Sequence, residues 1–167
     1  MIDLDYINSL AEPEAKAAFL KCCGAPRWAE RMARRRPYRS EPELLESARQ
    51  IWRTLERADW LQAFDAHPKI GEGDLKGKFA KTAAWSAAEQ AGLAGAPDAL
   101  LQALADANRA YEARFGYIFI VCASGKTAAE MLALLEQRLK SNPEDELHVA
   151  ALEQEKITFL RLQKMTP

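Results

Sequence analysis

The stretch EPELLESARQIWRTL, residues 41–55, decides the fold class of this chain. Its apolar residues recur at steps of three and four, which is the spacing that lines one face of an α-helix. They are Leu44, Leu45, Ala48, Ile51, Trp52 and Leu55. A proline is tolerated in the first helical turn, so Glu41-Pro42-Glu43 marks the start of this helix.

Similar start and stop signals follow one another along the chain and predict an all-α fold. We expect one compact domain, residues 1–167, made of roughly eight helices. They are predicted around residues 15–20, 26–32, 41–55, 60–66, 85–91, 98–114 and 127–139, and from Asn142-Pro143 onward. Asp59 is the expected cap of the fourth, and the last should bury Leu147, Leu152, Ile157, Leu160 and Leu162.

Residues 117–123 interrupt this helical pattern with β-branched and aromatic side chains that locally favour a strand. A lone strand has no sheet to join. We therefore expect a buried extended segment or a distorted helix. Its seven apolar residues form the longest such run in the chain, which is too short to span a bilayer.

Composition excludes several functional classes. The 167 residues are 49% hydrophobic and 28% charged, an ordinary balance for one globular domain. With 23 basic and 24 acidic residues the net charge is −1, so no global field favours nucleic acid or an anionic membrane. Three cysteines without a CxxC spacing, and no signal peptide, favour reduced thiols in the cytoplasm. Two histidines are too few for a histidine-rich metal cage.

The first candidate for chemistry is His67-Pro68, which opens the loop HPKIGEGDLKGKFAK of residues 67–81. Imidazole titrates near neutral pH, so it can give or take a proton without much tuning. Proline restricts the exit of the chain, and Gly71 and Gly73 would let backbone approach a small ligand. The alternative is a histidine that only interacts with the last carbonyls of a helix.

Three further groups could bind a small polar molecule. Ser86, Glu89 and Gln90 share one helix face, although Ser86 and Glu89 also fit a capping box. Arg161 could grip a carboxylate through two parallel hydrogen bonds, or merely extend into water. The backbone of residues 119–123 could form a wall against a ligand, or simply belong to the core, with the Cys122 thiol structural. This third group consists of Phe119, Ile120, Val121, Cys122 and Ala123.

Two other patterns suggest functions that we set aside. Ser124-Gly125-Lys126-Thr127 ends like a phosphate-binding loop, but Ile120 stands where that loop needs its first glycine. The sequence is better interpreted as a turn followed by a helix cap. The basic run of Arg31, Arg34, Arg35, Arg36 and Arg39 could touch nucleic acid or another partner, which leaves a non-catalytic helical interaction module as the alternative function.

Four blocks in order resemble the 2-oxo-4-hydroxy-4-carboxy-5-ureidoimidazoline (OHCU) decarboxylase family. They are HPKIG at residue 67, WSAAEQAGL at residue 85, RFGYIFIVCASGK at residue 114 and EKITFLRL at residue 155. The resemblance implies an all-α homodimer, a carboxy-lyase of purine metabolism that converts OHCU to (S)-allantoin in uric acid degradation. It also implies that no metal or organic cofactor is used. A related enzyme acting on another ureido-heterocycle stays open.

The resemblance also assigns residues. The catalytic histidine of the family falls on His67. Its substrate-contacting residues fall on Pro68, Ser86, Glu89, Gln90, Phe119, Ile120, Val121, Cys122, Ala123 and Arg161. The chain ends in Met165-Thr166-Pro167 rather than in a peroxisomal S-K-L signal, which agrees with a cytoplasmic protein.

Overall fold

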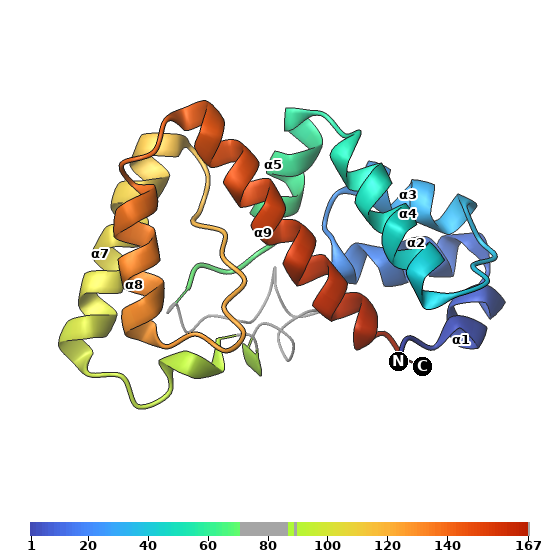
Figure 1. The fold of residues 1–167 in the computed structure, drawn as a ribbon, viewed down its shortest axis with the longest axis horizontal. Helices are drawn as coiled ribbons and strands as arrows, with labels where there is room; N and C mark the ends of the chain where they lie inside the picture. Colours follow the sequence, from blue (N-terminus) through green and yellow to red (C-terminus); the bar gives the residue numbers. More distant parts are fainter. Residues whose placement is uncertain (71–86, 89, 167) are drawn as a thin grey trace. The chain divides into compact units, whose positions relative to one another are not determined.

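The computed structural model describes residues 1–70, 87–88 and 90–166. Within these residues the chain forms helices and no β-strand, which confirms the all-α prediction (Figure 1). The α-helices are α1 (Leu4–Ser9), α2 (Glu12–Cys22), α3 (Pro26–Arg34), α4 (Glu41–Arg53), α5 (Arg57–Asp65), α7 (Asp98–Phe115), α8 (Ala128–Arg138) and α9 (Pro143–Gln163). A 3₁₀-helix, η2, covers Ala91–Leu93. Of the helix expected around residues 85–91, residues 85, 86 and 89 lie outside the described residues, 87–88 are helical, and Gln90 is a turn residue that caps η2 rather than a member of that helix.

Local capping chemistry fixes where most helices begin. The Ser40 side chain accepts a hydrogen bond from the Glu43 N–H at 3.3 Å, just before α4. At α8, Thr127 accepts from the Glu130 N–H, and the Glu130 carboxylate accepts from the Thr127 N–H at 2.7 Å. This is the capping box expected from the sequence, and the reading of Ser124–Thr127 as a turn and cap is confirmed.

The predicted start of α5 is wrong by one turn. Asp59 was expected to precede the helix, but α5 begins at Arg57 and Asp59 lies in its first turn. There its carboxylate accepts from the Glu56 N–H at 3.1 Å. An acidic side chain in the first turn can satisfy the amide at the helix start as well as a true cap can, so local sequence does not distinguish the two positions.

Contacts between Cα atoms divide the chain into two units, which are described separately. The first comprises residues 1–63 and 155–167. In it α2 packs on α3, and α3 packs on α4. Phe19 and Trp28 are fully buried and meet edge to face at 5.9 Å, and the indole N–H of Trp28 donates to the Ala48 carbonyl. Apolar and aromatic burial therefore holds these helices together.

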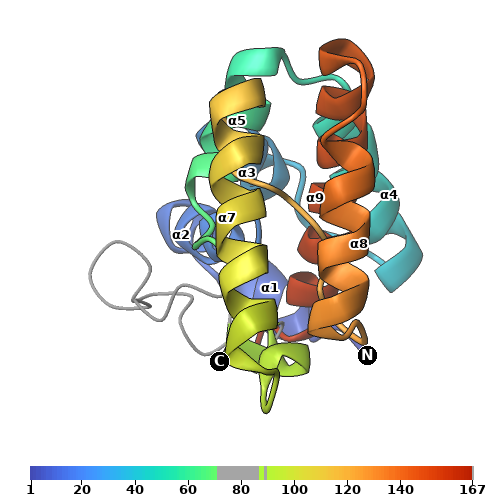
Figure 2. The same cartoon turned by 90° about the vertical axis from the view of Figure 1, so that its left-hand side faces the viewer.

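The second unit, residues 64–154, contains α7 and α8 side by side (Figures 1 and 2). Gly116, at φ 81°, ends α7 in the left-handed conformation that glycine adopts without strain. The chain between α7 and α8 then passes through residues 117–123, which are mostly buried and neither helical nor paired as a strand. This agrees with the predicted buried segment and excludes a distorted helix.

One expected core residue is exposed. Leu147, Ile157 and Leu162 of α9 are buried, but Leu152 keeps 49% of its surface accessible. Five residues of an α-helix advance about 140° beyond one full turn, so a residue five positions after Leu147 points away from the face that Leu147 buries. None of the described helices is long and apolar enough to cross a membrane.

Candidate functional site

His67 lies two residues after the end of α5 and is 9% exposed. Its backbone N–H donates to the Phe64 carbonyl at 3.1 Å, so the last turn of the helix continues to the histidine. Its Nε2 lies 2.6 Å from Oε1 of Gln154. An amide oxygen can only accept, so in this arrangement Nε2 carries the hydrogen. Pro68, which follows, is also buried.

Gln154 fixes the orientation of this imidazole and was not identified from the sequence. It lies on α9 and is fully buried, which is unusual for a glutamine. A signal exists: Gln154 follows Leu147 and Ala150 at steps of three and four and precedes Ile157, so a polar residue interrupts the buried face of the helix. A buried amide in such a position needs a specific hydrogen-bond partner.

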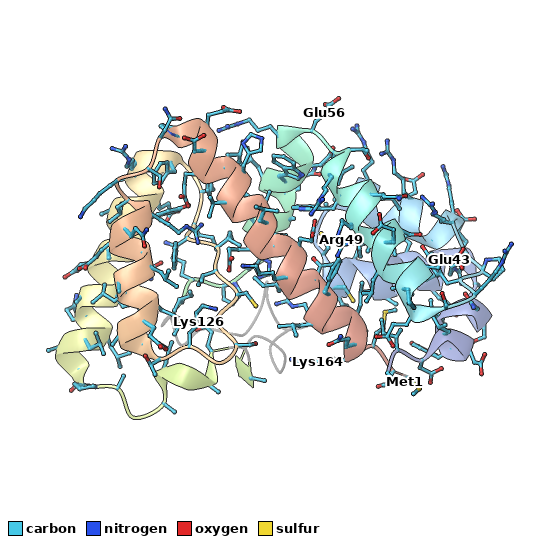
Figure 3. The ribbon with its side chains drawn as sticks, in the orientation of Figure 1. Met1, Glu43, Arg49, Glu56, Lys126 and Lys164 are labelled. Atoms are coloured by element: carbon cyan, nitrogen blue, oxygen red, sulfur yellow. The ribbon has the colours of Figure 1, made fainter. Side chains whose placement is uncertain are left out.

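Residues 119–123 are all buried, and side chains from elsewhere in the same unit bond to their backbone. The Ile120 carbonyl accepts from Arg138 at 2.6 Å. The Cys122 N–H donates to Glu153 at 2.7 Å. The Cys122 carbonyl accepts from the ammonium of Lys126, labelled in Figure 3, at 2.8 Å. Buried backbone outside regular structure needs such partners, and here charged side chains supply them.

Val121 lies between these anchored positions. It is buried, yet its peptide N–H and C=O form no hydrogen bond with any described residue. Buried peptide groups are almost always paired with protein, ordered water or ligand. The N–H and C=O groups of Val121 are therefore the part of this segment that retains hydrogen-bonding capacity for a bound molecule or water.

Helix α9 connects the histidine to this segment. Its consecutive residues Glu153 and Gln154 bond to the Cys122 N–H and to the His67 ring, respectively. Both contacts lie inside the unit of residues 64–154. Two of the regions singled out from the sequence are thus held by neighbouring positions of one helix.

Ser86 and Glu89 lie outside the described residues, as does most of the loop 67–81. Gln90 is half-buried and precedes η2. A Cβ atom placed on Gly92 would lie 1.8 Å from the Lys126 carbonyl oxygen, so only glycine fits there. This close approach places η2 against the turn that follows residues 119–123.

Arg161 belongs to the other unit, residues 1–63 and 155–167. It is 3% exposed, and its guanidinium donates to the Lys21 carbonyl at 3.3 Å. A buried arginine is rare unless it is paired, so the interpretation that Arg161 merely extends into water is wrong.

Four arginines of the basic run, Arg31, Arg34, Arg35 and Arg36, bond to acceptors within their own unit. Arg34 pairs with Glu30 at 2.7 Å and with Glu12 at 3.3 Å. Arg36 donates to the carbonyls of Ile7 and Leu10, at the end of α1. Since these guanidinium groups satisfy acceptors of their own unit, the run supports helix packing more than it supports a partner.

Among the described residues, neither a metal-binding cluster nor a surface hollow adds residues to the site. In the described part of the chain, no three His, Cys, Asp or Glu side chains gather where they could hold a metal ion. A hollow of about 340 Å³ beside α8 is lined by none of the candidate catalytic or substrate-binding residues. It is lined by Lys126, Glu130, Ala133, Leu134 and Gln137.

The sequence and the fold are similar to those of known proteins. The family model described as OHCU decarboxylase matches residues 8–163. The uric acid degradation bifunctional protein TTL of Arabidopsis thaliana is 42% identical over 146 residues, 86% of this chain. This match covers 45% of the Arabidopsis protein, so the chain spans less than half the length of that relative.

A relative of nearly the same length is the 2-oxo-4-hydroxy-4-carboxy-5-ureidoimidazoline decarboxylase of Amia calva. It is 28% identical over 165 residues, covering 97% of this chain and 93% of that protein. Among solved structures, an OHCU decarboxylase crystallised in the presence of (S)-allantoin superposes with a TM-score of 0.76. It is 40% identical, with 87% of this chain and 94% of that chain covered. The chain belongs to the OHCU decarboxylase family.

Proposed function

We propose that this chain is a carboxy-lyase that converts OHCU to (S)-allantoin in uric acid degradation. The observation that carries the proposal is the buried His67 imidazole, held by Gln154 at 2.6 Å, in the same unit as the anchored backbone of residues 119–123. A titratable ring and a backbone wall that are bonded by consecutive residues of α9 suit proton transfer to a small heterocycle. Membership of the family supports the choice of substrate.

The proposed reaction breaks the bond between the ring carbon and the carboxylate, and CO₂ leaves. The electron pair passes into the conjugated C=N and C=O groups of the substrate ring, so the substrate itself is the electron sink. We therefore propose that neither metal nor organic cofactor takes part. A proton from His67 is then added, on one face, to the adjacent ring carbon that carries the ureido group, which makes the product a single enantiomer. The carbon that lost the carboxylate keeps its oxygen, whose hydroxyl proton is given up while the charged ring nitrogen gains one, and becomes a carbonyl of allantoin. Holding the substrate in one orientation in a water-poor site supplies the remaining acceleration.

The binding roles in this proposal follow the resemblance residue by residue. Arg161 anchors an anionic or carbonyl oxygen, since a guanidinium binds such groups through paired hydrogen bonds. Ser86, Glu89 and Gln90 bind ureido and ring N–H groups. Pro68 fixes the chain beside the imidazole, and the wall is formed by Phe119, Ile120, Val121, Cys122 and Ala123.

We further propose that residues 1–167 act as one domain, as a homodimer in the cytoplasm. The family model spans both units, and α9 contributes residues to each, which supports a single cooperative domain. The three cysteines, all within the described residues, form no disulfide, which is compatible with a reducing compartment. One thermal transition, and a mass of two chains by light scattering, are the expected results.

The test of the function follows the ultraviolet absorbance of freshly generated OHCU. We expect wild-type protein to accelerate its decay and to yield one enantiomer of allantoin, measured by circular dichroism. Replacing the histidine, His67→Asn, should keep the fold but lower kcat by about 10²–10⁴-fold, the usual contribution of general acid–base catalysis. Wild-type turnover in this variant contradicts the assignment.

The chain offers a matched control, because it has only one other histidine. His148 is exposed on α9, and its Nδ1 lies 2.9 Å from the Glu144 carbonyl. The variant His148→Asn should retain wild-type activity. Close analogues of OHCU, assayed in parallel, separate this substrate from other ureido-heterocycles. If no substrate of this group decays faster with wild-type protein, the proposed function is wrong.

A further inference from the structure

A buried ion pair contacts the backbone of residues 119–123. Arg138, at the end of α8, donates a hydrogen bond from Nε to Glu146 of α9 at 2.7 Å, and its Nη2 lies 2.6 Å from the same carboxylate oxygen as an ion pair without hydrogen-bond geometry. Glu146 is fully buried and Arg138 is 8% exposed. The Tyr111 hydroxyl donates to the same carboxylate oxygen of Glu146. Burial, together with this hydrogen bond, raises the pKa of Tyr111, so the phenol stays protonated and remains a donor.

The remaining guanidinium nitrogen of Arg138 bonds to the backbone of residues 119–123. The third guanidinium nitrogen of Arg138 donates to the Ile120 carbonyl at 2.6 Å, while the guanidinium lies 4.6 Å from the centre of the Phe119 ring. A planar guanidinium with five fixed donors, one face of which is occupied by an aromatic ring, has little freedom to rotate. The position of the Ile120 peptide is thereby tied to α8 and, through Glu146, to α9.

Stability alone does not account for such a cluster. Replacing a buried ion pair with apolar side chains of similar volume is often neutral or stabilising, because the desolvation of two charges offsets their attraction. What the charges add here is direction, since they fix a carbonyl in a stretch that has no helix or strand to fix it. The N–H and C=O of the next residue, Val121, form no hydrogen bond with a described residue, and they are held in place as a result.

We propose that Arg138, oriented by Glu146, is a positioning residue that fixes the backbone at Ile120 for substrate binding. The inference rests on the proposed function, in which residues 119–123 contact OHCU. It goes beyond that function because neither Arg138 nor Glu146 needs to touch the substrate. Tyr111 completes the set by holding the Glu146 carboxylate from the side of α7.

The decisive variant removes both charges together, Arg138→Met with Glu146→Leu, so that neither is left buried without its partner. We expect this double variant to fold, as measured by circular dichroism and thermal unfolding. Its KM for OHCU should rise about tenfold, which corresponds to the loss of one to two net hydrogen bonds. Its kcat should change less, because the His67–Gln154 pair is untouched. Arg138→Lys should fall between this variant and wild type.

Arg36→Met is the matched control. Arg36 also donates to backbone carbonyls, those of Ile7 and Leu10, but in the other unit. We expect this variant to lower the unfolding temperature and leave KM unchanged. A rise in KM equal to that of the double variant would show a general effect of destabilisation and would overturn the inference.

The outcomes are distinguishable from those of the proposed function. An inactive wild type overturns both proposals. An active wild type, with a folded double variant of unchanged KM and kcat, overturns the positioning role alone. If the double variant does not fold, the single variants Arg138→Lys and Tyr111→Phe test the positioning role instead, because each retains the apolar packing. An unchanged KM for OHCU in both of them overturns the inference.

Discussion

Helices α1–α4 and residues 64–154 bury different kinds of side chain. The four helices, which the structure describes in full, bury many apolar side chains and one polar one, Ser47. Their charges pair at the surface, as Arg49, labelled in Figure 3, does with Glu46 at 2.7 Å. Among their described members, residues 64–154 bury several polar and charged side chains: His67, Asn108, Arg138, Glu146 and Gln154.

The difference follows from how the backbone groups of each region are hydrogen-bonded. Helices satisfy their own backbone, so α1–α4 require only apolar packing to hold them together. The segment of residues 117–123 is not helical, and its buried peptide groups must be bonded by side chains. Within residues 64–154, buried polar side chains therefore hold an irregular backbone and an imidazole in fixed positions.

The largest expected effect tests the apolar region. Phe19 is fully buried against Trp28, so Phe19→Ala should lower the free energy of unfolding by about 3–5 kcal/mol. Urea denaturation monitored by circular dichroism measures this. Phe19→Leu leaves a smaller cavity and should cost less. A loss below about 1 kcal/mol for Phe19→Ala would remove the contrast between the two regions.

The second prediction tests the polar region. Gln154→Leu should lower the free energy of unfolding by about 1–3 kcal/mol, since it leaves the buried Nε2–H of His67 without its acceptor, and should lower kcat/KM about 10- to 100-fold, because the His67 ring loses the partner that orients it. Gln154→Glu should move the alkaline limb of the pH–rate profile to higher pH, since a carboxylate beside an imidazole favours its charged form and His67 donates its proton from that form. If both variants have wild-type pH–rate profiles, Gln154 does not act through the histidine.

The smallest effect concerns the three thiols. Burial raises the pKa of Cys22 and of Cys23 to about 12, so at pH 8 only about one in ten thousand of either is the reactive thiolate. Cys122, at 8% exposed against 0% and 1% for the other two, should react first with a disulfide reagent. Cys22 and Cys23 should react only after denaturation.

Rates of thiol labelling, followed by absorbance, check this order, and Cys122→Ser should abolish the early phase. If the proposed function holds, added (S)-allantoin should slow the labelling of Cys122 relative to the protein without ligand. Equal rates for all three thiols in the folded protein would show that the two regions open together rather than separately.

Much of the fold could be predicted, but less of the site. Pro26, Pro42 and Pro143 mark the starts of α3, α4 and α9 because the constraint is local. Leu152 was misplaced because its exposure depends on which side of α9 faces the core. His67 was recognisable by its chemistry and its motif, whereas Gln154 was not.

The sequence by itself determined the helices, through caps and prolines that act within about four residues, and the family, through blocks of residues in order. Only the tertiary structure decided the pairings of the site. His67 and Gln154 are 87 positions apart, and Tyr111 and Glu146 are 35 positions apart. A helical hydrogen bond joins neighbours in the chain, but a side chain finds a distant partner only when packing brings the two elements together.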